Sequence, residues 1–263
     1  MELWRYRAGR TPLLVSMPHT GTYVPEPLLA RLTPAARALP DTDWHLERLY
    51  DFLDDLGASV LVATHSRYVV DLNRPPDNAS LYPGQDTTGI VPLDTFHKQP
   101  VYLASAPAED EVRARIEAYW RPYHAKLAAE LARLKDAHGH ALLWDAHSIF
   151  SELPRFFSGR LPELNLGTAD GRACGPGIGE ALLAEVRGYR AVLNGRFKGG
   201  YITRSYGHPE DGIHAVQLEL AESAYMDETP PYRFRDELAA RLRPQLRRLL
   251  ETFVRLARAP RKD

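Results

Sequence analysis

Cysteine and net charge are both scarce in this chain of 263 residues, which has one cysteine, Cys174, and a formal net charge of -1. A single cysteine excludes an intrachain disulfide and a metal site made of several cysteines. With so little net charge, nothing indicates binding to nucleic acid or to an acidic membrane surface. No apolar run approaches the roughly 20 residues of a membrane span, and the first residues lack a signal-peptide core. We therefore expect a cytoplasmic protein without nucleic-acid or membrane partners, whose oligomeric state the sequence leaves open.

The rest of the composition is globular, with 44% hydrophobic and 25% charged residues. The length suits one large α/β domain. Neither a repeat nor a linker divides the chain, so residues 1–263 are predicted to form a single domain. Strand-like and helical segments alternate along the sequence, which predicts a mixed, mostly parallel sheet flanked by helices.

Apolar periodicity and turn residues place the individual elements. Strands are expected at residues 13–17, 59–63, 68–72, 142–144, 190–193 and 214–220. Helices are expected at residues 34–37, 107–137, 178–186 and 234–257. A further helix is expected to begin at a cap formed by Asp41 or Thr42 and to end at Gly57. Pro122 should kink or split the longest helix. Residues 75–100 and 151–177 are expected to be irregular.

Three of the expected strands carry polar residues suited to catalysis. His19 and Asp145-Ala-His147-Ser148 follow apolar runs, and Glu219 lies on the alternating segment 214–220. The carboxyl ends of strands are where ligands bind in open α/β sheets. Two histidines and a glutamate at such ends are suited to a zinc hydrolase. Asp145 alternates with His147, so both point to one face and Asp145 can orient the imidazole.

A catalytic zinc site needs a third protein ligand. Residues 41–45, Asp-Thr-Asp-Trp-His, offer an acid for this role, although carboxylates that open a helix are ordinarily caps. His19 by itself would be interpreted as a turn histidine in solvent.

Gln217 and Glu219 share one face of their strand, opposite its apolar residues. A carboxylate in that position is paired or functional. Glu219 is therefore either the partner of an arginine or a general base beside a metal-bound water.

Two segments are candidates for binding a carboxylate. Asn73 and Arg74 end the expected strand 68–72, and arginine binds carboxylates bidentately. The alternative is a cluster that caps the loop before Pro75. Arg204, in a stretch with glycines at 195, 199, 200 and 207, is the second candidate.

Taken together, these stretches resemble the N-formylglutamate amidohydrolase family, the deformylases of histidine breakdown. The matching segments are residues 16–21, 41–45, 67–74, 145–148, 199–204 and 217–220. They appear in order over about residues 13–225, most of the chain. The family is similar to a distant branch of the zinc carboxypeptidase fold, of the phosphorylase/hydrolase-like type.

The resemblance implies roles for particular residues. In the wider fold, His-Ser at a strand end supplies the last metal ligand, Asn-Arg holds a substrate carboxylate, and a late glutamate is the general base. His147, Asn73 with Arg74, and Glu219 fit these roles, with Asp145 and Gln217 as their supporting residues. Carboxypeptidases take their first two ligands from His-x-x-Glu, whereas His19 is followed at that spacing by Thr22. Asp43 is therefore expected to be the remaining ligand, with Asp41, His45 and Glu47 as alternatives.

The function that follows is zinc-dependent hydrolysis of N-formyl-L-glutamate to formate and L-glutamate. Zinc would be held by His19, Asp43 and His147. Glu219 would act as base, and Asn73, Arg74 and Arg204 would bind the substrate carboxylates. The alternatives are a related zinc N-acyl amino-acid deacylase or carboxypeptidase, and a non-catalytic protein that binds carboxylates.

Overall fold

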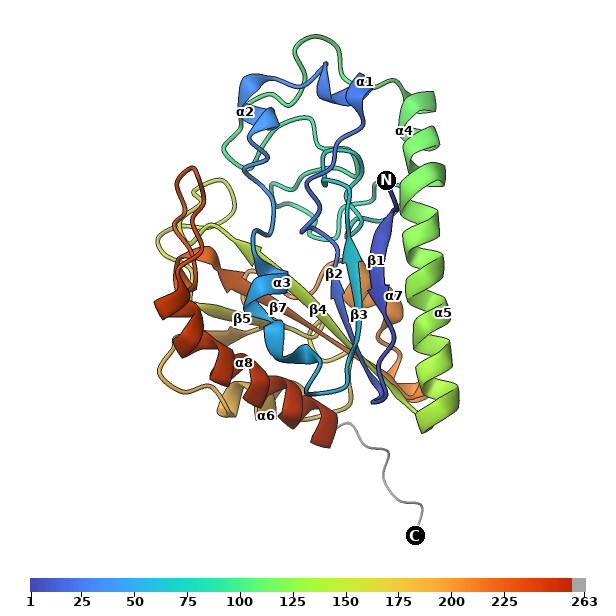
Figure 1. Ribbon diagram of the computed structural model, residues 1–263, viewed down its shortest axis with the longest axis vertical. Helices are drawn as coiled ribbons and strands as arrows, with labels where there is room; N and C mark the ends of the chain where they lie inside the picture. Colours follow the sequence, from blue (N-terminus) through green and yellow to red (C-terminus); the bar gives the residue numbers. More distant parts are fainter. Residues whose placement is uncertain (257–263) are drawn as a thin grey trace.

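The computed structural model describes residues 1–256, and a seven-stranded sheet forms its centre (Figure 1). The strands are β1 (Trp4–Arg7), β2 (Leu13–Met17), β3 (Ser59–Ala63), β4 (Ala141–Ile149), β5 (Leu164–Gly167), β6 (Ala191–Leu193) and β7 (Ile213–Ala221). Their order across the sheet is β1-β3-β2-β4-β7-β5-β6. β1 pairs with β3 and β5 pairs with β7 antiparallel, and the other neighbours are parallel. The predicted mixed, mostly parallel sheet is confirmed.

Helices cover both faces of this sheet. One face packs against α4 (Glu109–Arg115), α5 (Arg121–His138) and α7 (Tyr201–Tyr206), and the other against α3 (Leu46–Leu49), α6 (Ile178–Ala184) and α8 (Asp236–Leu256). α1 (Glu26–Leu29) and α2 (Pro34–Arg37) lie among the loops at the top of Figure 1. Ala257, the last residue of the predicted final helix, lies outside the described residues. No helix within residues 1–256 is long and apolar enough to cross a membrane.

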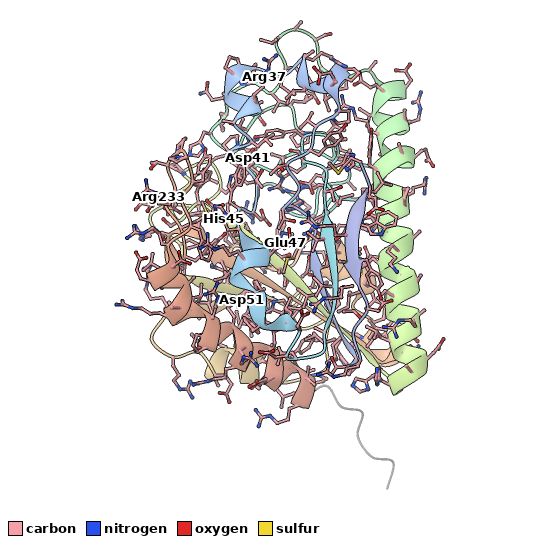
Figure 2. All side chains as sticks on the ribbon, viewed as in Figure 1. Arg37, Asp41, His45, Glu47, Asp51 and Arg233 are labelled. Carbon is pink, nitrogen blue, oxygen red and sulfur yellow. The ribbon has the colours of Figure 1, made fainter. Side chains whose placement is uncertain are left out.

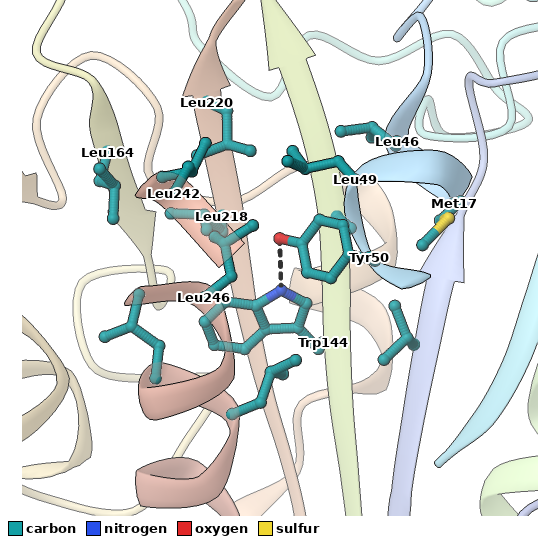
Figure 3. Packing of buried hydrophobic residues seen from close by; sticks show 14 of the residues in the cluster. Met17, Leu46, Leu49, Tyr50, Trp144, Leu164, Leu218, Leu220, Leu242 and Leu246 are labelled. Carbon is teal, nitrogen blue, oxygen red and sulfur yellow. Dashed lines mark hydrogen bonds between the residues drawn. The ribbon is translucent and has the colours of Figure 1, made fainter. Parts of the chain in front are cut away.

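Alternation along the strands divides the core into two layers. On β4, Leu143 packs in the layer that contains Leu127 of α5, whereas Trp144 packs in the layer that contains Leu246 of α8. Trp144 is fully buried, and its indole N–H donates to the hydroxyl of Tyr50 at 3.2 Å (Figure 3). This bond satisfies a polar group that would be costly to bury without a partner. Because β4 is buried on both faces, its polar residues are held in a rigid setting.

The strand predicted at residues 68–72 is wrong. These residues form turns, in which the amide of Val69 donates to the carbonyl of Ser66 at 2.9 Å and that of Asn73 donates to the Asp71 carboxylate at 2.8 Å. A short apolar run is consistent with a strand or with other buried backbone. Here the aspartate side chain bonds the backbone two residues on, which favours a turn.

The helix predicted from a cap at Asp41 or Thr42 to a stop at Gly57 is also wrong over most of its length, because the α-helix α3 covers only Leu46–Leu49 and a 3₁₀ turn, Asp51–Leu53, follows it. His45 has a left-handed backbone with φ of 64°, so α3 begins only at Leu46. Asp41 caps no helix, since its carboxylate accepts from the Tyr68 hydroxyl at 2.8 Å and the Phe96 amide at 2.9 Å. Residues 41–45 therefore form an irregular segment that passes directly beside the end of β2.

Other departures are smaller. The stretch predicted to be irregular at 151–177 contains β5, and β1 was not predicted. The long helix is interrupted by a π-helical turn, Ile116–Trp120, just before Pro122. The helix continues on both sides of this turn (Figure 1), so the kink or split predicted at Pro122 appears only as a local change of hydrogen-bonding pattern next to a residue that has no N–H to donate.

Candidate metal and substrate site

Polar side chains gather at the carboxyl ends of β2, β4 and β7. In the register between β4 and β7, Asp145 lies opposite Gln217 and His147 lies opposite Glu219. Alternate residues of a strand share a face, so these four lie on the same side as Leu143, toward α5 and α7. Parallel strands thus bring two rows of polar residues together at one edge of the core.

Three of the predicted residues form one compact cluster. His19, Asp43 and His147 each offer a ligand atom, and these atoms lie within 4.8 Å of one another. The Asp43 carboxylate oxygen Oδ2 is 3.1 Å from Nδ1 of His147 and 3.8 Å from Nδ1 of His19. All three side chains are buried. Asp43 reaches the histidines because its backbone N–H donates to the carbonyl of His19 at 3.0 Å.

The second nitrogen of each imidazole faces another carboxylate. Nε2 of His19 is 2.7 Å from Asp71, and Nε2 of His147 is 3.0 Å from Asp145. A metal-binding histidine usually donates its other N–H to such a partner, which fixes the tautomer and ring orientation. Both Nδ1 atoms are thereby left to face Asp43. Two imidazoles and one carboxylate with supporting acids make a donor set that could hold a metal ion.

The charges around the cluster favour a cation there. Burial and the nearby Arg67 guanidinium lower the pKa of His19. Burial also disfavours the charged form of His147, but the carboxylates of Asp145 and Asp43 raise its pKa well above the usual range. Burial opposes ionisation of Asp71, yet His19 and Arg67 hold the pKa of that carboxyl well below its usual range. His147 therefore lies between two anions, a position that suits positive charge.

Glu219 is buried beside this cluster. Burial raises its pKa to about 7, although the positive charge of His147 opposes the shift. Its carboxylate accepts from the side-chain amide of Gln217 at 2.9 Å and forms no ion pair with an arginine in the described part of the chain. The alternative interpretation of Glu219 as the partner of an arginine is therefore wrong.

The cluster lines a pocket whose other walls come from loops. Arg67, Arg74 and Arg196 supply its cations, and Tyr82, Phe96, Phe156 and Phe197 supply its rings. His19, Asp43, Asn73, His147, Gln217 and Glu219 also line it. Arg204 is not among the lining residues. Its Nε donates to the Gly199 carbonyl at 2.8 Å, and its guanidinium lies 5.1 Å from the centre of the Tyr82 ring.

Asn73 connects the pocket wall to the cluster. Its amide nitrogen lies 2.9 Å from Nε2 of His147 and donates to Asp145 at 3.3 Å, while its oxygen accepts from the Ile202 amide at 2.8 Å. The glycine-rich loop, residues 194–200 between β6 and α7, passes so close that a Cβ on Gly200 would lie 2.3 Å from the Asn73 side chain. Only glycine allows this approach.

Known proteins with similar sequences identify the family. The sequence model of the N-formylglutamate amidohydrolase family matches residues 11–226. An N-formylglutamate deformylase from Pseudomonas aeruginosa is 52% identical over 257 residues, which cover 96% of each chain. The corresponding protein from Pseudomonas putida is 51% identical over 253 residues, covering 95% of this chain and 94% of the relative. The chain belongs to the N-formylglutamate amidohydrolase family.

Solved structures agree with this membership. The crystal structure of an N-formylglutamate amidohydrolase from Ralstonia eutropha superimposes with a TM-score of 0.80 at 26% identity, over 98% of this chain and 97% of that one. A protein from Agrobacterium tumefaciens gives a TM-score of 0.74 at 18% identity, over 97% of this chain and 96% of that one. The latter likeness shows a shared fold.

Within this amidohydrolase fold, the alternatives to Asp43 are occupied elsewhere. Figure 2 labels Asp41 and His45 on the segment that leads into α3, and Glu47 within α3. Asp41 is bonded to Tyr68 and Phe96, Nε2 of His45 lies 2.7 Å from the Tyr232 carbonyl oxygen, and Glu47 pairs with Arg5. Of the four candidates, Asp43 is the one that the structure brings to both histidines.

Sequence reasoning missed two residues of the amidohydrolase site. Asp71 was assigned to the end of a strand, so its contact with His19 across 52 residues could not be foreseen. Arg196 was not singled out, although it lies in the same glycine-rich stretch as Arg204. The one signal for it was an arginine between Gly195 and Phe197, in the stretch of glycines that also precedes Arg204.

Proposed function

We propose that this protein is a zinc-dependent amidohydrolase that cleaves N-formyl-L-glutamate to formate and L-glutamate. The observation that carries the proposal is the buried cluster of His19, Asp43 and His147, with Glu219 next to it. The proposal draws on the relative from Pseudomonas aeruginosa, which is named N-formylglutamate deformylase and is 52% identical.

The metal would be held by His19, Asp43 and His147. When bound, zinc would supply a Lewis acid for the formyl carbonyl and for the attacking water. Asp71 and Asp145 would keep the histidine Nε2–H groups directed away from the cluster, so that each Nδ1 lone pair stays available. This arrangement is also why the two carboxylates belong to the proposed machinery, although neither would touch the metal.

Glu219 would handle the proton. As the water oxygen forms its bond to the formyl carbon, the carboxylate takes the water proton. The same group then gives that proton to the amide nitrogen as the carbon–nitrogen bond breaks, so formate and the free amine of glutamate result. Burial raises the pKa of Glu219 to about 7, and a pKa near the working pH suits both halves of this transfer.

Arg74 would bind a substrate carboxylate. Its guanidinium is held by the carbonyl and hydroxyl of Thr88 at 2.9 and 3.3 Å and by the carbonyl of Asn73 at 3.2 Å. These partners are neutral, so the positive charge remains available to an anion. Asn73 would contribute chiefly by holding His147 and the glycine-rich loop in place.

The test is formate release by the purified protein loaded with zinc, before and after chelation with the metal content measured. We expect activity with zinc, its loss on metal removal and its return on reloading. His19→Ala should lower both zinc content and activity. Formate release that continues after verified metal removal would reject the metal role. N-acetyl-L-glutamate in parallel distinguishes a general deacylase, and glutamate binding without turnover would indicate a non-catalytic protein.

A further inference from the structure

Arg196 enters the pocket from the loop between β6 and α7, inside a group of aromatic rings. Its guanidinium carbon lies 5.3 Å from the centre of the Tyr82 ring, 5.6 Å from that of Phe156 and 5.4 Å from that of Phe197. Its Nε donates to the Phe156 carbonyl at 2.7 Å, and one terminal nitrogen lies 3.4 Å from the backbone oxygen of Asp86. The side chain is thus held in position by neutral groups.

No carboxylate forms an ion pair with this arginine among residues 1–256, and Glu219 and Asp86 act on it only from beyond ion-pair distance. Other arginines near the pocket differ: Arg67 pairs with Asp71 at 2.8 Å, and Arg155 pairs with Asp86 at 3.0 Å. Burial lowers the pKa of Arg196, and the positive charge of Arg74 acts in the same direction. Two guanidinium groups without an ion-pair partner in the described chain therefore line one pocket, a costly arrangement unless an anion completes it.

The proposed substrate supplies two anions. N-formyl-L-glutamate carries an α-carboxylate next to the amide nitrogen and a second carboxylate at the end of its side chain. Arginine and carboxylate form bidentate, charge-assisted pairs. One free arginine would suffice for any N-acyl amino acid, whereas two match a dicarboxylic one.

We propose that Arg196 binds the side-chain carboxylate and so selects dicarboxylic N-acyl amino acids, an assignment that rests on the function proposed above. Arg74 is the better partner for the α-carboxylate. It directly follows Asn73, whose amide lies 2.9 Å from His147, so Arg74 is tied to the reacting end of the pocket. Arg196 comes from a separate wall, among rings that also cover the methylene groups of the substrate.

The experiment compares N-formyl-L-glutamate with N-formyl-L-glutamine, which has nearly the same shape and an uncharged side chain. For Arg196→Gln we expect kcat/KM on the glutamate compound to fall on the order of 100-fold, since removing one partner of a buried charge pair has effects of that size. Activity on the glutamine compound should change little. Arg196→Lys keeps the charge and should retain much of the preference.

Two other arginines provide matched controls. Arg74→Gln should lower kcat/KM for both substrates by a similar factor, because both carry the α-carboxylate. Arg204→Gln should leave the ratio between the substrates unchanged, since Arg204 contacts Tyr82 and Gly199 outside the lining. Thermal unfolding of each variant verifies that it is folded.

The outcomes separate this inference from the proposed function. An active wild-type enzyme whose preference for glutamate survives Arg196→Gln would overturn the role of Arg196 and leave the deformylase proposal intact. If the wild-type protein hydrolyses neither compound, the deformylase proposal fails. Calorimetric binding of L-glutamate against L-glutamine then tests Arg196 by itself, and equal affinities for the two in the wild-type protein would overturn its role.

Discussion

The two ends of the pocket are built differently. At one end, His147 and Glu219 project from paired strands buried on both faces, and His19 and Asp43 lie directly beside them. At the other end, Arg196 and the rings of Tyr82, Phe156 and Phe197 come from loops and are only partly buried. Arg196, Tyr82 and Phe156 each belong to a different loop, and their contacts are ring faces and backbone carbonyls.

This difference separates reaction from recognition. Groups that must hold a metal and move a proton need positions fixed to a fraction of an ångström, which strands of a packed core provide. Groups that select a substrate are placed on loops, where sequence and length can vary without disturbing the core. We therefore expect changes at the strand end to act mainly on kcat, and changes at the loop end mainly on substrate preference and KM.

The largest effect is expected at Glu219, in the strand end of the pocket. Glu219→Gln keeps the size of the side chain but removes the proton acceptor. We expect kcat to fall on the order of 1000-fold, the usual range for loss of a general base. Zinc content, measured by elemental analysis, should stay at the wild-type level because Glu219 is outside the ligand cluster. Normal turnover by this variant would remove Glu219 from the mechanism.

His124 of α5 supports the segment that carries Asn73 and Arg74, and its effect should appear in stability. Nε2 lies 2.8 Å from the Leu72 carbonyl, just before Asn73 and Arg74, and Nδ1 lies 3.0 Å from the Tyr206 hydroxyl of α7. Burial lowers the pKa of His124 to about 4. Because the unfolded chain binds the proton more readily, stability is complete above about pH 6.5 and falls toward pH 4, by roughly 3 kcal/mol in total.

Urea unfolding at pH 7 and pH 4.5 measures this effect. His124→Gln can still form hydrogen bonds but does not titrate, so the acid-induced loss should be smaller in the variant than in the wild-type protein. His208→Gln changes an exposed histidine and should follow the wild-type dependence. If His124→Gln loses as much stability on acidification as the wild type, other buried groups account for the pH dependence.

Predictability from sequence follows the same division between strands and loops. The proximity of Asp145, His147 and Glu219 could be predicted from the sequence, because alternation along a strand and pairing of parallel strands follow simple rules. Asp43 could only be chosen from a segment, since its reach depends on the irregular backbone before His45. The sheet was predictable for this reason, while the short β5 hidden in a loop-like stretch was not.

The loop contacts depended on tertiary structure. The apolar run before Asp71 is compatible with either a strand or buried turns, and only the folded chain places this carboxylate on His19. Arg196 and Arg204 are eight residues apart in one glycine-rich stretch, and no periodicity indicates which faces the pocket. In the structure Arg204 belongs to α7 and lies 5.1 Å from the centre of the Tyr82 ring outside the pocket lining, whereas Arg196 precedes the helix and lines the pocket.

The smallest effect is expected for Tyr82→Phe, which changes the loop end of the pocket alone. The hydroxyl accepts from the Lys198 amide at 3.2 Å and donates to the Gly199 carbonyl at 2.9 Å, which holds the glycine-rich loop against the ring. The variant loses these bonds but keeps the ring beside Arg196. Each lost hydrogen bond is worth about 1 kcal/mol, so KM for N-formyl-L-glutamate should rise by about fivefold to 30-fold with kcat nearly unchanged. Tyr119→Phe, outside the pocket lining, should leave both constants as they are. A fall in kcat as large as the rise in KM would mean that the loop also positions the reacting atoms, and reaction and recognition would then no longer be separable in this pocket.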